Sequence, residues 1–157
     1  GRAVAAATHA GFDAFCRLCG DRPFMPLDDM QRGIGVLRQS FTNGNPLDLV
    51  TTHLPSPVPA GLLTEVIRTD TLAGIHESTT TEEQCEHVTT VFYEHPEKFQ
   101  IHRLETSLRA LGTVHLSVDT ERDQQLIGRI IKENPALDFS ERGAAAAWQK
   151  LPESHPA

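Results

Sequence analysis

Apolar side chains recur along most of this chain with the three- and four-residue spacing of an amphipathic helix. The clearest stripe consists of Met30, Ile34, Leu37 and Phe41. Asp28 or Asp29 can cap this segment, and the turn residues at 43–46 end it. We therefore expect a helix between these two signals, with its apolar stripe in the core.

Proline, glycine and asparagine divide the rest of the chain into further pieces of helical length. An alanine-rich segment from Ala3 to Cys19 ends at Gly20, which is typical of a helix with a C-terminal glycine. Four shorter helices are expected at 47–54, around 62–67, after a cap at Asp119 or Thr120, and after a cap at Ser140.

Two adjacent segments predict a central helical hairpin at about 79–112. Thr79 and Thr80 each precede a glutamate by three residues, which is the spacing of a capping box. Pro96 suits the first turn of the second helix, and Gly112 closes it. The hairpin unites more start, stop and apolar-face signals than any other stretch, so we expect it to be the structural centre.

The only strand-like stretch is Thr113–Val118, where apolar and polar residues alternate. It is short and finds no second strand to pair with, so we interpret it as a linker. The predicted fold class is therefore all-α, an irregular bundle of about six to eight short helices. We expect one helical domain over 1–151 and a mobile tail at 152–157.

The acidic character of the chain narrows the choice of partners. It contains 21 acidic and 14 basic residues, a formal net charge of −7, so its field repels nucleic acid and anionic membranes. The longest apolar runs, Ala3–Ala7 and Ala144–Trp148, are far shorter than the roughly 20 residues of a membrane-spanning helix. We expect a soluble protein without a nucleic-acid partner or a membrane span.

The chain begins with Gly1 and not with Met, so an organellar origin after N-terminal processing stays open. The compartment and the oligomeric state are not predicted.

Cys16-Arg17-Leu18-Cys19 is a CxxC motif, which can form a disulfide or supply half of a zinc site. It falls near the end of a predicted helix, where the helix dipole raises a thiol pKa, and the chain has no second CxxC. We expect ordinary half-buried thiols here. The alternative is a redox or metal-binding dithiol.

A second polar cluster surrounds His87. Glu83 and His87 share a helix face at i, i+4, and His76, His95 and His102 lie nearby in the sequence. Di-iron helical bundles need two Glu-x-x-His motifs, and this sequence contains none. We expect a solvated helix face, with a metal site as the alternative.

No catalytic, cofactor-binding or metal-binding residue is assigned, because the sequence has no Gly-x-Ser-x-Gly elbow. Gly33-Ile34-Gly35 lacks the third glycine of a dinucleotide loop, so we attribute these glycines to a bend or to the close approach of another helix. Tyr93 and Trp148 each join an apolar ring to a polar group. They are our candidates for a partner interface, with a place at the edge of the core as the alternative.

The stretch from Thr80 to Leu111 resembles periplasmic immunity proteins that neutralise type VI secretion effectors. Both have a helix, a turn like His95-Pro96-Glu97 and a second helix ending in Ala-Leu, although the family's cysteine positions are not reproduced here. The same hairpin, with Trp148–Pro152, is similar to small helical accessory subunits of respiratory complex I. Both resemblances imply a helical protein that acts by binding another protein.

We therefore expect a non-catalytic protein that acts by protein–protein contact, as an accessory subunit of a larger assembly without a cofactor. The alternative is a small immunity or inhibitor protein that blocks an effector enzyme, where the acidic charge would suit a basic effector. The second alternative is a helical redox or metal-dependent enzyme that uses Cys16 and Cys19 or the histidines near His87.

Overall fold

The computed structural model of the chain describes residues 2–54, 58–78, 89–112, 114–134 and 140–150. These residues fall into two compact units, each described by itself. The first unit comprises 1–17, 30–51 and 64–104, and the second comprises 18–29, 52–63 and 105–157.

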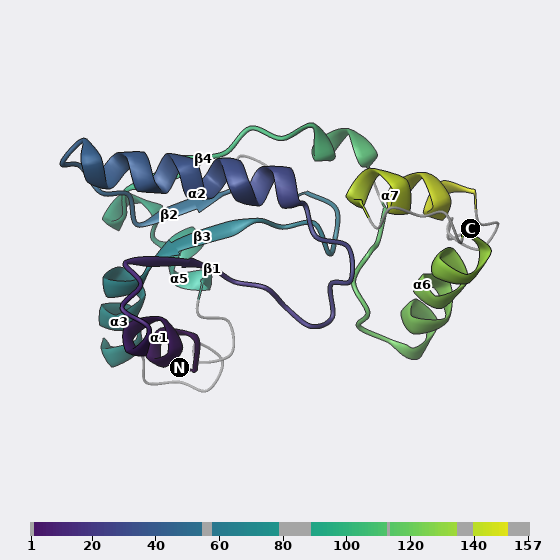
Figure 1. Cartoon of the computed structure of the whole chain (residues 1–157), viewed down its shortest axis with the longest axis horizontal. Helices are drawn as coiled ribbons and strands as arrows, with labels where there is room; N and C mark the ends of the chain where they lie inside the picture. The colour runs from purple at the N-terminus through teal and green to yellow at the C-terminus, as the bar shows by residue number, and fades with distance from the viewer. Residues whose placement is uncertain (1, 55–57, 79–88, 113, 135–139, 151–157) are drawn as a thin grey trace. The chain divides into compact units, whose positions relative to one another are not determined.

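A four-stranded mixed sheet forms the centre of the first unit (Figure 1). Its strands, in their order across the sheet, are β1 (Ala14–Cys16), β3 (Glu65–Arg68), β2 (Leu49–Thr51) and β4 (Ile101–Arg103). β3 pairs antiparallel with β1 and β2, with Ile67 opposite both Phe15 and Leu49. β4 pairs in parallel with β2. The all-α fold class that we expected is therefore wrong, and the protein is mixed α/β.

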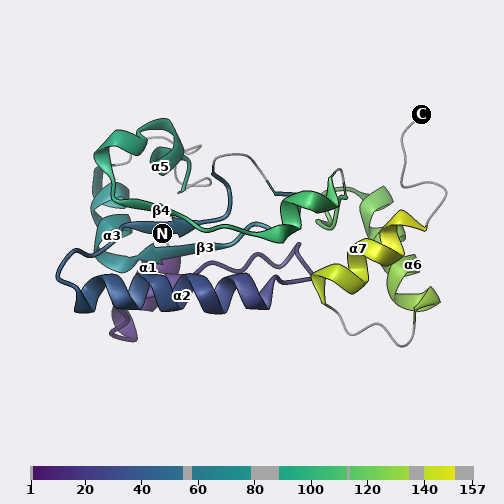
Figure 2. The ribbon, with the colours of Figure 1, turned by 90° about the horizontal axis from the view of Figure 1, so that it is seen from above.

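Helices cover both faces of this sheet (Figures 1 and 2). One face packs against α2 (Leu27–Thr42), and the other packs against α1 (Arg2–His9), α3 (Thr69–Ser78) and α5 (Thr90–Glu94). Strand residues alternate between the two layers. Val50 and Val66 join Leu37 of α2, whereas Leu49 and Ile67 face the opposite helices.

The predicted helix after Asp28 and Asp29 is confirmed as α2, and both aspartates lie in its first turn. Gly33 sits on its buried face, where a Cβ atom would come 3.0 Å from Cγ2 of Val66. A close approach does explain this glycine, but the neighbouring element is strand β3 and not a second helix.

Four segments that we expected to be helical are strands. β1 lies inside the expected helix from Ala3 to Cys19, whose helical part is α1, and β2 and β3 stand in place of the short helices at 47–54 and 62–67. β4 lies within the expected hairpin. These strands have only three or four residues each, too few to show a period, so the sequence pattern cannot distinguish them from helical segments.

The central hairpin at 79–112 is also wrong in its described part. After α5 the chain makes a 3-10 turn (Pro96–Lys98), enters β4 and makes a second 3-10 turn (Ser107–Leu111). Pro96 does begin a helical turn, but only a short one. The expected capping boxes at Thr79 and Thr80 lie outside the described residues.

The second unit is built around α6 (Glu121–Glu133) and α7 (Glu141–Gln149), which lie side by side in both views (Figures 1 and 2). Both helices and their caps, Thr120 and Ser140, are confirmed. Their core contains Ile127 and Ile130 of α6 and Trp148 of α7, together with residues from the other segments of the unit.

None of the described helices is both long and apolar enough to cross a membrane. The expected tail at 152–157 lies outside the described residues, and the number of domains stays a prediction.

Candidate functional site

A pocket of about 250 Å³ in the second unit collects polar side chains from three separate segments. It is lined by Asp21, Arg22, His53, Val58, Pro59, Ala60, Gly61, Leu63, Ser117 and Asp119. Two carboxylates, a guanidinium and an imidazole therefore share one small pocket, which makes it the candidate functional site.

One extended segment brings the walls of this pocket together. The backbone N–H of Leu116 donates to the carbonyl of Ala60 at 2.9 Å, and that of Val118 donates to the carbonyl of Asp21 at 2.8 Å. Because this segment is bonded to Ala60 on one side and to the turn that contains Asp21 on the other, it carries Asp119 to the pocket that Asp21 also lines.

Gly61 allows the close contact on which this arrangement depends. Its φ is +89°, and a Cβ atom would lie 2.5 Å from the carbonyl carbon and oxygen of Leu116 and 2.8 Å from the nitrogen of Ser117. Only glycine fits here, because a side chain would collide with backbone atoms and the positive φ would be strained. The loop before β3 therefore packs directly on the segment that leads to Asp119.

Ser117 and His115 hold the carboxylate of Asp119. The Ser117 hydroxyl donates to Oδ2 of Asp119 at 2.6 Å and lies 3.1 Å from Nε2 of His115. The same Nε2 atom is 3.3 Å from Oδ2 of Asp119. Ser117 is buried, whereas the Asp119 side chain is 55% exposed, so a fixed hydroxyl orients a carboxylate that a ligand can reach.

Within the described residues, His115, Asp119 and Asp123 form one group whose ligand atoms lie within 4.8 Å of one another. Oδ2 of Asp123 accepts hydrogen bonds from the backbone and hydroxyl of Thr120, both at 2.8 Å, as part of the capping box of α6. The Thr120 hydroxyl is the main cause that lowers the pKa of Asp123. Asp123 thus serves the helix start, and Asp119 is the member of the group that also lines the pocket.

Arg109 fixes the segment that carries His53. Its Nη2 atom donates to the carbonyl oxygens of Thr52 and Leu54, at 2.6 and 2.5 Å. These two residues flank His53, so the guanidinium clamps the backbone on both sides of a pocket-lining imidazole.

The CxxC residues do not contribute to this pocket. Cys16 lies in β1 of the first unit and Cys19 in the second, and both are free and half-buried. Burial, more than any charge, raises the pKa of the Cys16 thiol. A raised pKa keeps a thiol protonated, and the protonated form is the unreactive one.

The second predicted cluster falls mostly outside the described residues, which include neither Glu83 nor His87. His76 is half-buried, and His95 and His102 are exposed.

The Tyr93 hydroxyl donates to Oε1 of Glu65 at 2.6 Å and lies 2.9 Å from Oγ1 of Thr51. Trp148 is buried in the core of the second unit. As partner contacts, Tyr93 and Trp148 stay predictions.

Sequence reasoning missed the two pocket carboxylates. It treated Asp119 only as a helix cap, and it assigned no role to Asp21, which follows the segment from Ala3 to Cys19 that was expected to be one helix and contains α1 and β1. The alternation in Thr113–Val118 was the available signal, because a strand-like segment followed at once by an aspartate is a common way to present a carboxylate at the end of a strand. Its partners were hidden, since Asp21 and Ala60 lie far away in the sequence.

No protein family model and no curated protein matches this chain. Among solved structures, it is similar to a cytidylyltransferase from Leptospira borgpetersenii serovar Hardjo-bovis (strain JB197), with 19% sequence identity and a TM-score of 0.81. The similarity covers 98% of this chain and 63% of that chain, so this chain spans less than two thirds of the length of that protein. At this identity the likeness shows a shared α/β fold.

This finding corrects the functional expectation as well as the fold. The accessory subunit, the immunity protein and the helical redox or metal enzyme all presupposed a helical protein, and so did the two resemblances in the hairpin. The chain instead has a mixed α/β fold similar to that of the cytidylyltransferase, so the non-catalytic accessory role is withdrawn.

Proposed function

We propose that the pocket of the second unit binds the phosphates of a nucleoside triphosphate with a divalent cation, and that the protein belongs to a nucleotidyl-transferring enzyme. One observation carries the proposal: Asp21 and Asp119 come from distant segments to one pocket, in a fold similar to that of a cytidylyltransferase. Because that similar protein acts with a cytidylyl group by its name, CTP is the first substrate to test.

The reaction sets the chemical requirements of such a site. An acceptor oxygen attacks the α-phosphorus of the triphosphate, the bond from that phosphorus to the bridging oxygen breaks, and pyrophosphate leaves. Little covalent chemistry is left to the protein, so its work is to position the phosphates and to balance their negative charge.

The donor set of the pocket fits Mg²⁺. This ion prefers carboxylate oxygens, keeps several waters and binds through one or two carboxylates together with substrate phosphates. Asp21 and Asp119 supply two carboxylates, and the exposure of Asp119 leaves room for those waters. When bound, the cation would neutralise charge on the phosphates. Ser117 would keep the Asp119 carboxylate aimed, through its 2.6 Å hydrogen bond.

The other lining residues suit the remaining parts of a nucleotide. Arg22 offers a guanidinium, which matches phosphate geometry, and His53 offers an imidazole on a segment that Arg109 clamps. Val58 and Leu63 form an apolar wall on which a sugar or base can pack. The pocket thus joins anion-binding, cation-binding and apolar surfaces.

Calorimetric titration of the chain with CTP, with MgCl₂ or with EDTA, tests the proposal. We expect binding that requires Mg²⁺ and weakens by at least about tenfold in both Asp21→Asn and Asp119→Asn, since loss of a ligand costs no less than loss of a supporting group. Asp70→Asn is the matched control, because Asp70 is an exposed aspartate in the first unit. It should bind CTP as the unchanged chain does.

Two results would overturn this proposal: no Mg²⁺-dependent binding of CTP by the unchanged chain, or equal binding by Asp119→Asn. A parallel titration with ATP, GTP and UTP addresses the base. Equal affinity for all four would remove the preference for cytidine and leave the phosphate site in place.

A further inference from the structure

Strand β1 lies at the edge of the sheet, and among the described residues it pairs with β3 alone. Asp13 and Arg17, just outside the strand, form backbone hydrogen bonds to the β3 side at 2.8 and 3.4 Å. In an antiparallel pair such bonds fall on every second residue. The backbone N–H and C=O groups of Ala14 and Cys16 therefore point away from β3, along the open edge.

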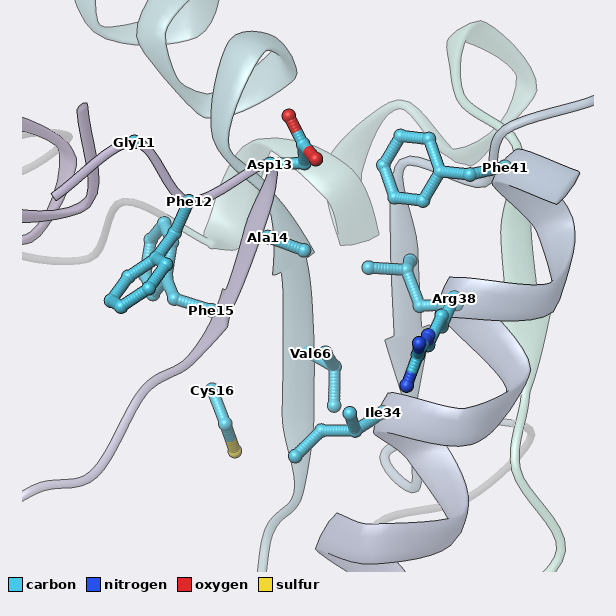
Figure 3. Close-up of a pocket in the computed structure, with 11 residues that line it drawn as sticks. Gly11, Phe12, Asp13, Ala14, Phe15, Cys16, Ile34, Arg38, Phe41 and Val66 are labelled. Atoms are coloured by element: carbon cyan, nitrogen blue, oxygen red, sulfur yellow. The ribbon is translucent and has the colours of Figure 1, made fainter.

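A groove of about 550 Å³ runs beside this edge, between β1 and α2 (Figure 3). Ile34 and Phe41 project into it from α2, and Ala14, Cys16 and Val66 form its strand side. Ile34 is 47% exposed and Phe41 is 37% exposed. The groove is thus apolar and open, on the same side of the sheet as the buried cluster around Leu37.

An open sheet edge next to an apolar groove favours unwanted pairing with other strands, and proteins usually avoid this arrangement. Edge strands are commonly protected by lysine, proline or a covering element, because their free backbone groups pair with any available strand. β1 has the sequence Ala-Phe-Cys, with neither lysine nor proline, and no other described strand pairs with its outer edge. Phe12, two residues before the start of the strand, is 61% exposed. These features indicate a surface that another segment covers.

The similarity to the cytidylyltransferase suggests a source for such a segment. The match takes in 98% of this chain but only 63% of that one, so part of that chain has no counterpart among these residues. We propose that the edge of β1 and the adjoining groove receive one further strand of the same sheet, supplied by polypeptide corresponding to that unmatched part. This proposal does not depend on the nucleotide pocket, which lies in the other unit.

The geometry sets the chemistry of the added strand. Its backbone would pair with Ala14 and Cys16, and every second side chain would point to the α2 side and meet Ile34 and Phe41. Those inward positions must be apolar, whereas the alternate ones meet the side of the sheet that Phe15 faces.

A capped synthetic heptapeptide, with valine at alternate positions and threonine or lysine between them, serves as the probe. Amide hydrogen exchange is followed by NMR on the 157-residue chain, with and without the peptide. We expect the amides of Ala14 and Cys16 to exchange at least about tenfold more slowly with the peptide, because they gain partners. The amide of Phe15 should not change, since by the same alternation it already faces β3.

Two variants and one control peptide complete the design. Ile34→Asp places a charge in the groove and should abolish the protection, whereas Gln39→Asp, at an exposed position of α2 outside the groove, should preserve it. A peptide with aspartate in place of valine should give none.

The proposal fails if Ala14 and Cys16 exchange equally fast with the peptide, or if Ile34→Asp retains the protection. It also fails if the chain alone protects both amides as its concentration rises while sedimentation shows a dimer. In that case the edge is taken by a second copy.

Discussion

Asp48 in the first unit and Asp119 in the second are the same residue type in contrasting surroundings. The Asp48 side chain is 10% exposed, and its two oxygens bind three partners from different elements. Oδ1 accepts from the Thr71 hydroxyl at 2.6 Å and pairs with the Arg68 guanidinium at 2.7 Å, and Oδ2 accepts from the backbone of Gln100 at 2.7 Å. Asp48 thereby ties together β3, α3 and the start of β4.

Asp119 has more than half of its side chain in solvent and is oriented mainly by one hydroxyl, that of Ser117. The difference shows how to separate a structural carboxylate from one that is available to a ligand. A carboxylate whose oxygens are already hydrogen-bonded across elements stabilises the fold, whereas one that is oriented yet exposed can exchange water for a cation.

The largest loss of stability is expected from a change that disturbs the backbone contact between Gly61 and the segment that leads to Asp119. Gly61→Ala should lower the free energy of unfolding by about 3 kcal/mol or more, because the backbone must move to relieve a 2.5 Å contact at positive φ. Gly44→Ala is the control, since Gly44 also has positive φ, +70°, but open space around it. It should cost about 1–2 kcal/mol. Equal losses in urea denaturation would show that the contact with Leu116 does not shape the pocket.

The two aspartates themselves come next. Asp48→Ala should cost about 2–4 kcal/mol, because it removes the carboxylate that pairs with the Arg68 guanidinium and accepts from the Thr71 hydroxyl and the Gln100 backbone. Asp119→Ala should change stability by no more than about 0.5 kcal/mol. Chemical denaturation of the two variants under one set of conditions measures both values. Comparable losses would mean that Asp119, too, has a structural role.

A smaller loss of stability is expected from removal of the Tyr93 hydroxyl, which forms a hydrogen bond to the sheet residue Glu65. Tyr93→Phe removes the hydroxyl that donates to Glu65, which is buried, and should cost about 1–2 kcal/mol at pH 7.

The dependence of stability on alkaline pH gives a second test of the role of the Tyr93 hydroxyl. Burial first, and then the Glu65 carboxylate, raise the pKa of Tyr93 above its usual range. An unfolded tyrosine loses its proton near pH 10, while the folded one keeps it. Stability should therefore fall as pH rises above about 10, by at most about 1.4 kcal/mol per pH unit. Burial raises the pKa of Cys16 too, with the same sign, so Tyr93→Phe is compared in a Cys16→Ser background. An unchanged alkaline slope in Tyr93→Phe would contradict the assignment.

The sequence predicted those elements whose signals are local. Helices α2, α6 and α7 were expected because an apolar stripe or a cap residue lies within the segment itself, as Thr120 and Ser140 show. The strands were not predicted because they form by pairing with residues that are distant in the sequence. Leu49 and Val50 form a strand by pairing with residues 66 and 67, and a run buried on both faces has no alternation to detect.

The candidate site could not be predicted from the sequence for the same physical reason. Asp21 and Asp119 line one pocket only because Leu116 and Val118 bond to Ala60 and Asp21, and no local pattern encodes pairings between such distant residues. The alternating stretch before Asp119 was visible, but a strand without a known partner could not be placed.

The most direct test of the account is to locate a bound cation. Mn²⁺, a paramagnetic stand-in for Mg²⁺, broadens the NMR signals of nearby amides when it is added in substoichiometric amounts. The account predicts broadening at Asp21, Gly61 and Asp119, none around Asp48, and its loss in Asp119→Asn. Broadening around Asp48, or broadening that survives in Asp119→Asn, would contradict the claim that Asp21 and Asp119 form the cation-binding part of the pocket.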